Sequence, residues 1–319
     1  MTLHYLCTLD LPDAWFAELQ RRMPEVAIHR ASGPGPLDGG TLARIDLLHT
    51  SSWFPAEAAD VPALRGVQLD TSGVDHVRPT WLWETELPIA TLGGIAPVPM
   101  AEYALMSILE LAHRMPRIER HRADRSWPSN AERLERLTPI PLAGARLASA
   151  FGMRVTGVRR GAGTASGERF DTGRSGAEES AETVGIDRLD EVLAATDVLV
   201  VVVPLTHLTR GMLDARRLDL LPVGALVVNI ARGGIVDETA LVERLRDGRI
   251  GGVALDVFDD EPLPPDSHWW TEPNALVTPH VAGLAPHYAS QTLDLVVENL
   301  TRLAEGRPMM NEVDRVAGY

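Results

Sequence analysis

The stretch ALVVNIARGGIVDETALVERLRDGRIGGVALDVFDDEP, residues 225–262, places two short apolar runs around one segment of helical period. The runs 225–231 and 251–258 are rich in Val and apolar almost throughout, which is typical of strands covered on both faces. Between them, Asp237 supplies a helix N-cap and Gly248 a C-terminal stop. A strand–helix–strand unit of this kind predicts parallel α/β architecture.

The same alternation continues on both sides of this unit. Further apolar runs that predict buried strands lie at 3–9, 45–50, 66–71, 153–158, 197–206 and 275–280. Helices are expected at 13–22, 98–115, 237–248 and 286–305. The helix over 98–115 is apolar on so wide a face that we expect it to be buried, between domains or between subunits. The tract 161–183 is poor in apolar residues and predicts a surface loop.

Length and charge limit the possible functions. A chain of 319 residues predicts two domains. Its formal charge of −14 argues against binding nucleic acid or an anionic membrane through the bulk surface. No stretch is as long and apolar as a membrane helix, and no basic leader opens the chain. We therefore expect a soluble, cytoplasmic protein with a small-molecule partner.

The single cysteine, Cys7, excludes an intrachain disulfide and a metal site built on several cysteines. Cys7 lies in an apolar run, so a buried and inert thiol is expected there. No metal site is predicted.

Three ionisable residues directly follow strands of the second half of the chain. They are Arg232, Glu261 and His280. Because ligands bind at the carboxyl ends of parallel strands, we expect these three side chains to meet. A guanidinium can hold a carboxylate through two hydrogen bonds, and a histidine oriented by a carboxylate can move a hydroxyl proton. The set suits oxidation of a hydroxy acid or reduction of a keto acid, although each residue alone could be an ordinary solvated or hydrogen-bonded group.

Several stretches closely resemble the D-isomer-specific 2-hydroxyacid dehydrogenases. They are VVVPLTHLTRGMLD (201–214), residues 226–264 and LVTPHVAG (276–283), and the likeness covers about 66–319. The resemblance implies two Rossmann- or flavodoxin-like domains with parallel sheets. The cofactor domain, 96–283, would be inserted into a substrate domain formed by 1–95 plus 284–319.

The resemblance also implies roles for individual residues. Arg232 would bind the substrate carboxylate and keto oxygen, His280 would be the acid/base, and Glu261 would support it. The stretch DTSGVDHV (70–77) matches a substrate-side loop, in which the backbone N–H groups of Ser72, Gly73 and Val74 would hold the carboxylate. Asp256 would lie near the nicotinamide. The residues implied at the cofactor are Pro204, Ile230, Ala231, Arg232, Asp256, His280 and Gly283.

One expected element is missing from the sequence. A dinucleotide domain should open with a strand, a G-x-G-x-x-G turn and a helix, because these glycines let the backbone approach the pyrophosphate. Residues 138–153 contain no such turn, and GAGTASG (161–167) follows the wrong strand. Either the sequence as given lacks a piece that the working enzyme has, which we favour, or dinucleotide binding has been lost.

The choice of cofactor depends on the end of the second strand of this domain. Arg159 and Arg160 stand there in place of an acidic residue. Two arginines suit a 2′-phosphate, so NADP(H) is favoured over NAD(H), unless both are simply solvated.

Two functions follow as hypotheses. The first is an NAD(P)-dependent oxidoreductase, a homodimer, that transfers a hydride between the cofactor and a small 2-keto acid or D-2-hydroxy acid. The alternative is a non-catalytic dimeric relative that has lost dinucleotide binding.

Overall fold

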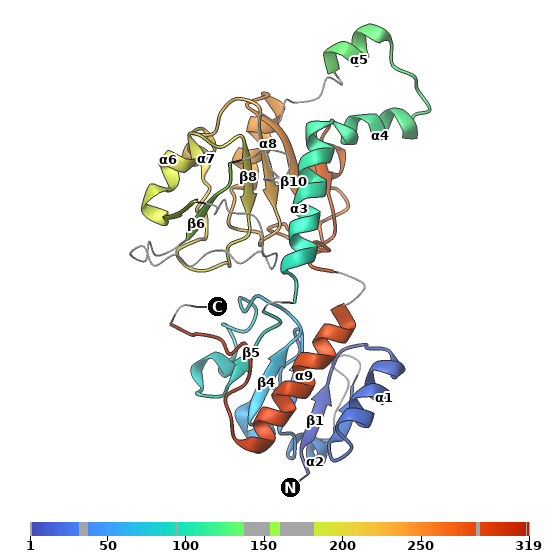
Figure 1. The fold of residues 1–319 in the computed structure, drawn as a ribbon, viewed down its shortest axis with the longest axis vertical. Coiled ribbons are helices and arrows are strands. Elements are labelled where there is room, and N and C mark those ends of the chain that lie inside the picture. Colours follow the sequence, from blue (N-terminus) through green and yellow to red (C-terminus); the bar gives the residue numbers. More distant parts are fainter. Residues whose placement is uncertain are drawn as a thin grey trace, which may run out of the picture. The chain divides into compact units, whose positions relative to one another are not determined.

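A computed structural model describes residues 2–31, 38–93, 95–136, 154–159, 182–284, 288–316 and 318. The chain divides into two compact units (Figure 1). Unit 1 comprises Met1–Pro99 and Gly283–Tyr319, and unit 2 is the intervening Met100–Ala282. The expected domains were 1–95 plus 284–319 and 96–283, and the bounds of the two units lie within a few residues of them. Their assignment to substrate and cofactor stays a prediction.

Unit 1 is built on a five-stranded parallel sheet in the order β2-β1-β3-β4-β5. Its strands are β1 (His4–Cys7), β2 (Ala27–Arg30), β3 (Leu47–Thr50), β4 (Gly66–Leu69) and β5 (Ile89–Ala90). Its helices are α1 (Asp13–Arg22), α2 (Gly39–Leu42) and α9 (Tyr288–Glu305), with short 3-10 helices at Ala58–Asp60 and Trp81–Glu84. This strand order is that of a flavodoxin-like sheet, whose ligands bind at the carboxyl ends of the strands.

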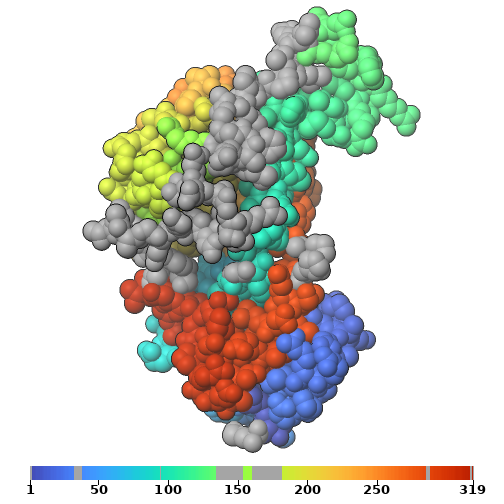
Figure 2. Space-filling model, viewed as in Figure 1, coloured from blue at the N-terminus to red at the C-terminus, as the bar shows by residue number. Residues whose placement is uncertain are grey.

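Helices α1 and α9 cover one face of the unit 1 sheet. Their apolar side chains pack in one cluster with Tyr5 and Cys7 of β1, so the cysteine is buried, as predicted. The two helices lie side by side, as the blue and orange-red surfaces in Figure 2 show. Trp15 also joins them, because its indole N–H donates to the carbonyl of Ala289 over 2.9 Å. Residues from distant parts of the sequence therefore form one domain.

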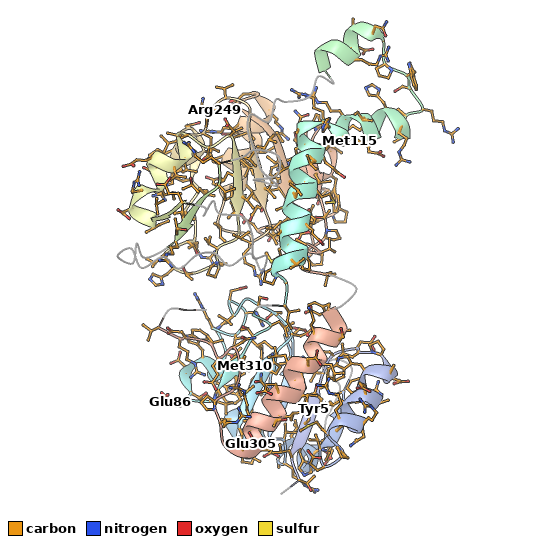
Figure 3. The ribbon with its side chains drawn as sticks, viewed as in Figure 1. Tyr5, Glu86, Met115, Arg249, Glu305 and Met310 are labelled. Carbon is orange, nitrogen blue, oxygen red and sulfur yellow. The ribbon has the colours of Figure 1, made fainter. Side chains whose placement is uncertain are left out.

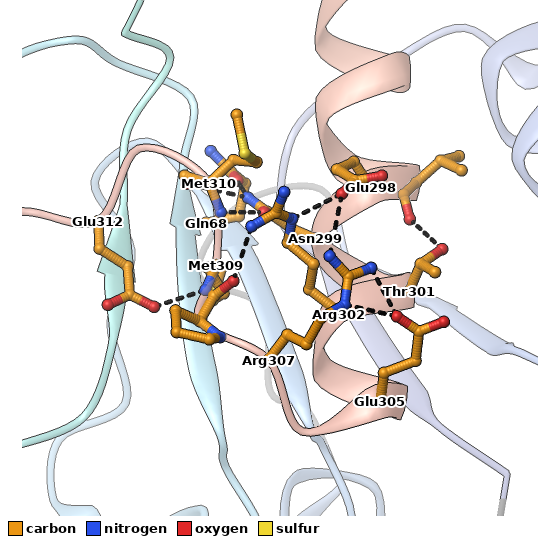
Figure 4. Close-up of polar contacts among 12 residues, drawn as sticks. Gln68, Glu298, Asn299, Thr301, Arg302, Glu305, Arg307, Met309, Met310 and Glu312 are labelled. Atoms are coloured by element: carbon orange, nitrogen blue, oxygen red, sulfur yellow. Dashed lines mark hydrogen bonds and ion pairs between the residues drawn. The ribbon is translucent and has the colours of Figure 1, made fainter.

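A buried amide pair also fixes α9 to the sheet (Figure 4). The Asn299 side chain donates to Gln68 Oε1 of β4 over 2.7 Å, and its own oxygen accepts from the Met310 backbone over 2.6 Å. Both amides are fully buried. Because buried polar groups are stable only when they are hydrogen-bonded, this pair specifies where α9 and the following segment meet the sheet.

Unit 2 contains two separate parallel sheets among its described strands. One has the order β11-β10-β9-β8, and the other pairs β6 with β7. The strands are β6 (Thr156–Arg159), β7 (Glu182–Gly185), β8 (Val198–Val201), β9 (Ala225–Asn229), β10 (Ile250–Leu255) and β11 (Ala275–Val277). The helices are α3 (Pro97–Ala112), α4 (Met115–Ala123), α5 (Asn130–Arg136), α6 (Leu189–Leu193), α7 (Ala215–Leu218) and α8 (Glu238–Arg246), with 3-10 helices at Ile186–Arg188 and His268–Thr271.

All the strand pairings described are parallel, so the prediction of an α/β fold with parallel sheets is confirmed. The four-stranded sheet of unit 2 is covered on both faces. Helix α3 packs on one face, and α6, α7 and α8 pack on the other. Covered faces explain why β9 and β10 are apolar almost throughout.

The strands that the structure describes in unit 2 form two sheets rather than the single sheet expected. In the usual order 3-2-1-4-5-6, strand 1 separates strand 2 from strand 4. Here β6 and β7 occupy the places of strands 2 and 3, and β8 occupies that of strand 4. Within the described residues β8 pairs with β9 alone. Residues 138–153, where the glycine turn was expected, lie outside the described residues, and the description resumes at Arg154.

Helix α3 is shorter than predicted, ending at Ala112 rather than at residue 115. A proline ring clashes with the carbonyl four residues earlier and offers no N–H to it. Pro116 therefore cannot continue the helix past Ala112. Arg114 takes a left-handed conformation, with φ of 55°, and α4 begins at Met115, which Figure 3 labels. Tyr103, Ser107 and Leu111 of α3 are buried, and the helix packs on the sheet of unit 2. Its expected place between domains or between subunits stays a prediction.

Two other predicted elements agree more closely. Helix α8 lies within 237–248, with the Asp237 side chain accepting from the Ala240 N–H over 2.9 Å and Gly248 taking a positive φ. Helix α9 begins at Tyr288 and ends before Gly306. The prediction of a loop over 161–183 was wrong at its end, where Glu182 and Thr183 belong to β7. The rest of that tract lies outside the described residues.

Candidate active site

The candidate active site lies at the carboxyl ends of three neighbouring parallel strands. Arg232 follows β9, Glu261 follows β10 and His280 follows β11. Because β10 pairs with both of its neighbours in parallel, the loops after all three strands leave the sheet at the same edge. The order of the strands therefore brings a guanidinium, a carboxylate and an imidazole to one edge of the unit 2 sheet.

Glu261 orients the imidazole of His280. Its Oε2 lies 2.8 Å from His280 Nδ1, and its Oε1 accepts from the backbone N–H of Phe258 over 3.0 Å. One carboxylate thus fixes both its own loop and the histidine ring. The two side chains are 35% and 45% exposed, so they remain accessible to a ligand. No described residue bonds to the opposite ring nitrogen, Nε2.

Asp256 holds the backbone on both sides of His280. Its buried carboxylate accepts from Thr278 Oγ1 over 2.6 Å and from the N–H groups of Val281 and Ala282 over 2.8 Å each. The Asp256 carbonyl also accepts from the His280 N–H over 2.9 Å. His280 itself has a φ of 55°, an uncommon conformation for a residue other than glycine. These bonds stabilise a strained backbone that presents the imidazole.

Tyr103 of α3 extends this network into the core. Its hydroxyl lies 2.5 Å from Thr278 Oγ1, and since the threonine proton is directed to Asp256, the tyrosine is the donor. Burial raises the pKa of Tyr103, so this hydroxyl keeps its proton across the ordinary pH range. The helix that covers the sheet thereby also supports the histidine loop.

The loop that carries Arg232 is held by Asn229 at the end of β9. The Asn229 side chain accepts from the Ala231 N–H over 3.2 Å and donates to the Arg232 carbonyl over 3.3 Å. The guanidinium donates to the Ala231 carbonyl over 2.7 Å. A buried amide that bonds on both sides restricts the conformations open to the arginine backbone.

The close approach of two loops explains why glycine follows Arg232. A Cβ at this position would lie 2.0 Å from the carbonyl oxygen of Phe258, so only glycine allows the loops after β9 and β10 to touch. The next residue, Gly234, donates its N–H to the Asp259 side chain. The arginine loop is therefore packed directly on the loop that holds Glu261.

The residues expected at the cofactor fall into different environments. Ile230 and Ala231 are buried in the unit 2 core, so only their backbones can face a ligand. Pro204 is exposed in the segment after β8, and Arg159 is exposed at the last position of β6. Arg160 lies outside the described residues. Asp256 and His280 have been placed above, and Gly283 is the first residue of the second segment of unit 1.

The expected substrate-side loop belongs to unit 1, where it follows β4. Ser72 is exposed, Gly73 is half-buried and Val74 is buried. The Thr71 hydroxyl donates to the Gly73 carbonyl over 2.8 Å and so closes the turn. The backbone N–H groups of residues 72–74 donate to no other described residue. Unpaired N–H groups in a turn are suited to binding an anion.

Sequence reasoning missed the residues that support the three site side chains. Asn229, Thr278 and Asp259 each bond to a backbone group or side chain of a site loop. The asparagine had a local signal, since an amide at a strand end often bonds to the following turn. The other two contacts join separate strand ends, and nothing in the local sequence indicates them.

The described residues contain neither a metal-binding cluster nor a membrane-spanning helix. They hold no cluster of three or more histidine, cysteine or acidic side chains that could bind a metal ion. None of the described helices is long and apolar enough to span a bilayer.

Comparison with known proteins adds independent information. A family model described as "D-isomer specific 2-hydroxyacid dehydrogenase, NAD binding domain" matches residues 105–282. Glyoxylate/hydroxypyruvate reductase A of Salmonella newport (strain SL254) is 39% identical over 136 residues, which make up 43% of this chain and 43% of that protein. The match therefore spans less than half the length of this curated relative.

Solved structures match over the whole chain. A D-isomer specific 2-hydroxyacid dehydrogenase from Xanthobacter autotrophicus Py2, in complex with NADPH and MES, is 28% identical with a TM-score of 0.78 and covers 100% of both chains. A family protein from Aeromonas salmonicida subsp. salmonicida A449 is 26% identical with a TM-score of 0.77, covering 99% of this chain and 100% of its own. The family model covers more than half of the sequence and includes Arg232, Glu261 and His280. The chain belongs to the D-isomer specific 2-hydroxyacid dehydrogenase family.

Proposed function

We propose that the protein is an NAD(P)H-dependent 2-keto acid reductase, which interconverts a small 2-keto acid and its D-2-hydroxy acid. The observation that carries this proposal is the Glu261–His280 pair at 2.8 Å, set beside the Arg232 loop at one edge of the sheet. A keto acid has a keto oxygen, which a general acid oriented by a carboxylate can protonate, and a carboxylate, which a guanidinium can bind.

Each residue has a definite part in this reaction. Arg232 binds the substrate carboxylate and polarises the keto oxygen through its planar guanidinium. His280 donates a proton from Nε2 to the oxygen as it becomes a hydroxyl, and Glu261 keeps the ring oriented through Nδ1. From the substrate-side loop of unit 1, the N–H groups of Ser72, Gly73 and Val74 would bind the carboxylate as well. When bound, a reduced nicotinamide supplies the hydride.

We propose NADP(H) as the preferred cofactor. The exposed Arg159 at the end of β6 fits an anionic 2′-phosphate, and Arg160 follows it in the sequence. The Xanthobacter relative is described in complex with NADPH, which supports the same choice. Pro204, Ile230, Ala231 and Gly283 would complete the site with their backbones, while Asp256 would act near the nicotinamide through the His280 loop.

Two experiments test the proposal, first cofactor binding and then turnover. NADPH and then NADH are titrated into the protein while its tryptophan fluorescence is followed. Glyoxylate and hydroxypyruvate, the substrates in the name of the Salmonella relative, are then assayed with each cofactor. We expect saturable binding, tighter for NADPH, and reduction of at least one keto acid.

Substitutions connect the activity to the site. His280→Ala and Arg232→Ala are expected to lose most of the turnover. His268→Ala is a matched control, because His268 is 44% exposed in the same unit and also lies near a glutamate, Glu272, at 3.9 Å. Near-normal kcat in either site variant would overturn the proposed roles.

A second candidate function is a non-catalytic relative that has lost dinucleotide binding. The absence of a G-x-G-x-x-G turn from residues 138–153 of the sequence favours it. A cooperatively folded protein that binds neither dinucleotide would support this candidate. Any cofactor-dependent reduction of a keto acid would exclude it.

We also propose that the protein is a homodimer that associates through α4 and α5. These helices lie away from the sheets of their own unit (Figure 1), and no residue of α4 is buried. Between them, Trp127 is 87% exposed. Large exposed aromatic side chains commonly mark an interface. Sedimentation of the wild type and of Trp127→Ser should show a dimer that the substitution weakens. A monomeric wild type would refute it.

A further inference from the structure

A buried cluster of titratable side chains lies at the carboxyl edge of the unit 1 sheet. Its centre is His49 of β3, which has no exposed surface. Tyr5 and Cys7 contribute from β1 (Tyr5 is labelled in Figure 3), and Asp70 directly follows β4. Because β1, β3 and β4 are adjacent in the sheet, the cluster bridges three strands. It ends at Asp70, the first residue of the substrate-side loop, 70–77.

The imidazole of His49 connects the core to Asp70. Its Nδ1 lies 2.6 Å from the Tyr5 hydroxyl and 3.9 Å from Cys7 Sγ. Its Nε2 lies 3.5 Å from Asp70 Oδ1, and neither of these two buried atoms has a hydrogen-bond partner among the described residues. The Trp15 ring packs against the imidazole, with 6.1 Å between ring centroids. The ring is thus aimed at the Asp70 carboxylate and excluded from water.

The charge of His49 favours this pairing. Burial on its own lowers the pKa of an imidazole, but Asp70 and Cys7 outweigh burial and raise the pKa of His49 to about 9. The imidazolium is therefore the form present at neutral pH. Burial also raises the pKa of Tyr5 well above its usual value, so the phenol stays neutral. A buried cation facing a single carboxylate is a strong positional constraint on that carboxylate.

The backbone of Asp70 transmits this constraint to the loop. Its N–H donates to the Thr50 carbonyl over 2.9 Å, and its carbonyl accepts from the Tyr288 hydroxyl of α9 over 3.2 Å. The next carbonyl, that of Thr71, accepts from the Leu92 N–H over 3.0 Å. The 72–74 loop, whose N–H groups donate to no other described residue, therefore starts from a residue fixed by its backbone and its side chain together.

We propose that His49 is a positioning residue for substrate binding: it holds Asp70, and thereby the 72–74 loop, in the geometry that binds the carboxylate of a 2-keto acid. This inference rests on the proposed function. His49 is too deeply buried to touch the substrate, so it acts only through Asp70. Its removal should weaken binding of the carboxylate and leave the proton transfer at His280 unchanged.

Two substitutions at His49 separate positioning from packing. His49→Leu removes both ring nitrogens, whereas His49→Gln keeps an N–H within reach of Asp70. We expect His49→Leu to raise the KM for the keto acid about tenfold, because the buried ion pair that positions Asp70 is lost, with kcat unchanged. His49→Gln should restore most of the KM. Asp70→Asn, which removes the charge from the other partner, should raise the KM as well and serves if His49→Leu does not fold.

Asn299→Leu is the matched control for stability. Asn299 is equally buried in unit 1 and bonds to Gln68, and it has no part in the His49 cluster. It should lower Tm without changing the KM. The positioning role is overturned if His49→Leu and Asp70→Asn lower Tm but leave the KM unchanged. It is also overturned if all three variants lower kcat and raise KM to the same extent.

Binding of oxamate, a non-reactive keto acid analogue, distinguishes this inference from the proposed function. Calorimetry measures its affinity for the wild type and the His49 variants. A wild type that reduces no keto acid but binds oxamate, more weakly after His49→Leu, supports the inference and overturns the proposed function. An active wild type with equal KM in all His49 and Asp70 variants overturns only the inference. A wild type that neither reduces keto acids nor binds oxamate overturns both.

Discussion

Replacing Asp256 by Asn changes the support of His280 while keeping the shape of the side chain. In the wild type, Oδ1 accepts from Thr278 and Val281, and Oδ2 accepts from Ala282 over 2.8 Å. An asparagine oxygen in the Oδ1 position can keep the first two bonds. Its amide nitrogen would then face the Ala282 N–H, donor against donor. The opposite rotamer would place the nitrogen against two donors instead of one.

The cost of this change follows from the burial of the site. Asp256 is 1% exposed and Ala282 is 3% exposed, so water cannot replace the lost acceptor. A hydrogen bond to a charged group contributes about 1.5–3 kcal/mol, and a buried unsatisfied donor costs about 1–3 kcal/mol. Since the two overlap, we expect Asp256→Asn to destabilise unit 2 by about 3 kcal/mol. For a domain of this size that corresponds to a fall in Tm of about 6–12 °C.

Thermal unfolding followed by circular dichroism measures this effect, with Asp190→Asn as the control. Asp190 is an exposed aspartate of the same unit that pairs with Arg216 and Arg217 on the surface. Surface ion pairs contribute little, so the control should keep the Tm of the wild type. A Tm for Asp256→Asn equal to that of the control would refute the assignment of Asp256 as the support of the His280 loop. We expect kcat to fall in the same variant, because the strained backbone at His280 loses its anchor.

Three further outcomes are expected. Gly233→Ala places a Cβ against the Phe258 carbonyl and should reduce kcat/KM roughly a hundredfold in a steady-state assay, because Arg232 is displaced. The control, Gly39→Ala, should have no effect, because a Cβ there meets no atom within 4 Å. Asp237→Ala removes the N-cap of α8 and should lower the free energy of unfolding by about 1 kcal/mol in urea titrations, and an unchanged midpoint would contradict this. The folded-state pKa of His49 is raised, so its contribution of roughly 3 kcal/mol is present in full below about pH 6.5 and is lost as the pH rises through about 9. Tm measured from pH 6 to 10 should fall more steeply in the wild type than in His49→Leu.

The ends of a helix were predicted well where a capping residue marks them in the sequence. The N-cap at Asp237 and the positive φ of Gly248 bound α8 almost as the sequence suggested. Apolar runs alone overestimated strand lengths. The run 197–206 yields only the four residues of β8, because pairing with β9 ends at Val201. The strands β2 and β7 were not predicted, since they are short and partly polar, and only their neighbours in the sheet make them strands.

The candidate site was predictable to the extent that topology determines it. Arg232, Glu261 and His280 could be brought together from sequence, because consecutive parallel strands end at one edge. Bonds between separate loops could not be predicted. The acceptance of three donors by Asp256 and the contact of Gly233 with Phe258 depend on distances that only the packed loops define. The expectation that Asp256 acts near the nicotinamide stays a prediction.

The candidate active site and the expected cofactor site depend on different strands of unit 2. The edge that carries the candidate active site is formed by β9, β10 and β11, and the bonds that fix its loops run among residues 229–282 with support from α3. Neither β6 nor β7 contributes to those bonds. A dinucleotide, by contrast, must span from the end of β6 to the site at β10 and β11. Changes near β6 and β8 should therefore alter cofactor affinity, whereas changes among the loops after β9–β11 should alter the proton transfer. The geometry at Glu261 and His280 is then a property of β9, β10, β11 and the loops that follow them.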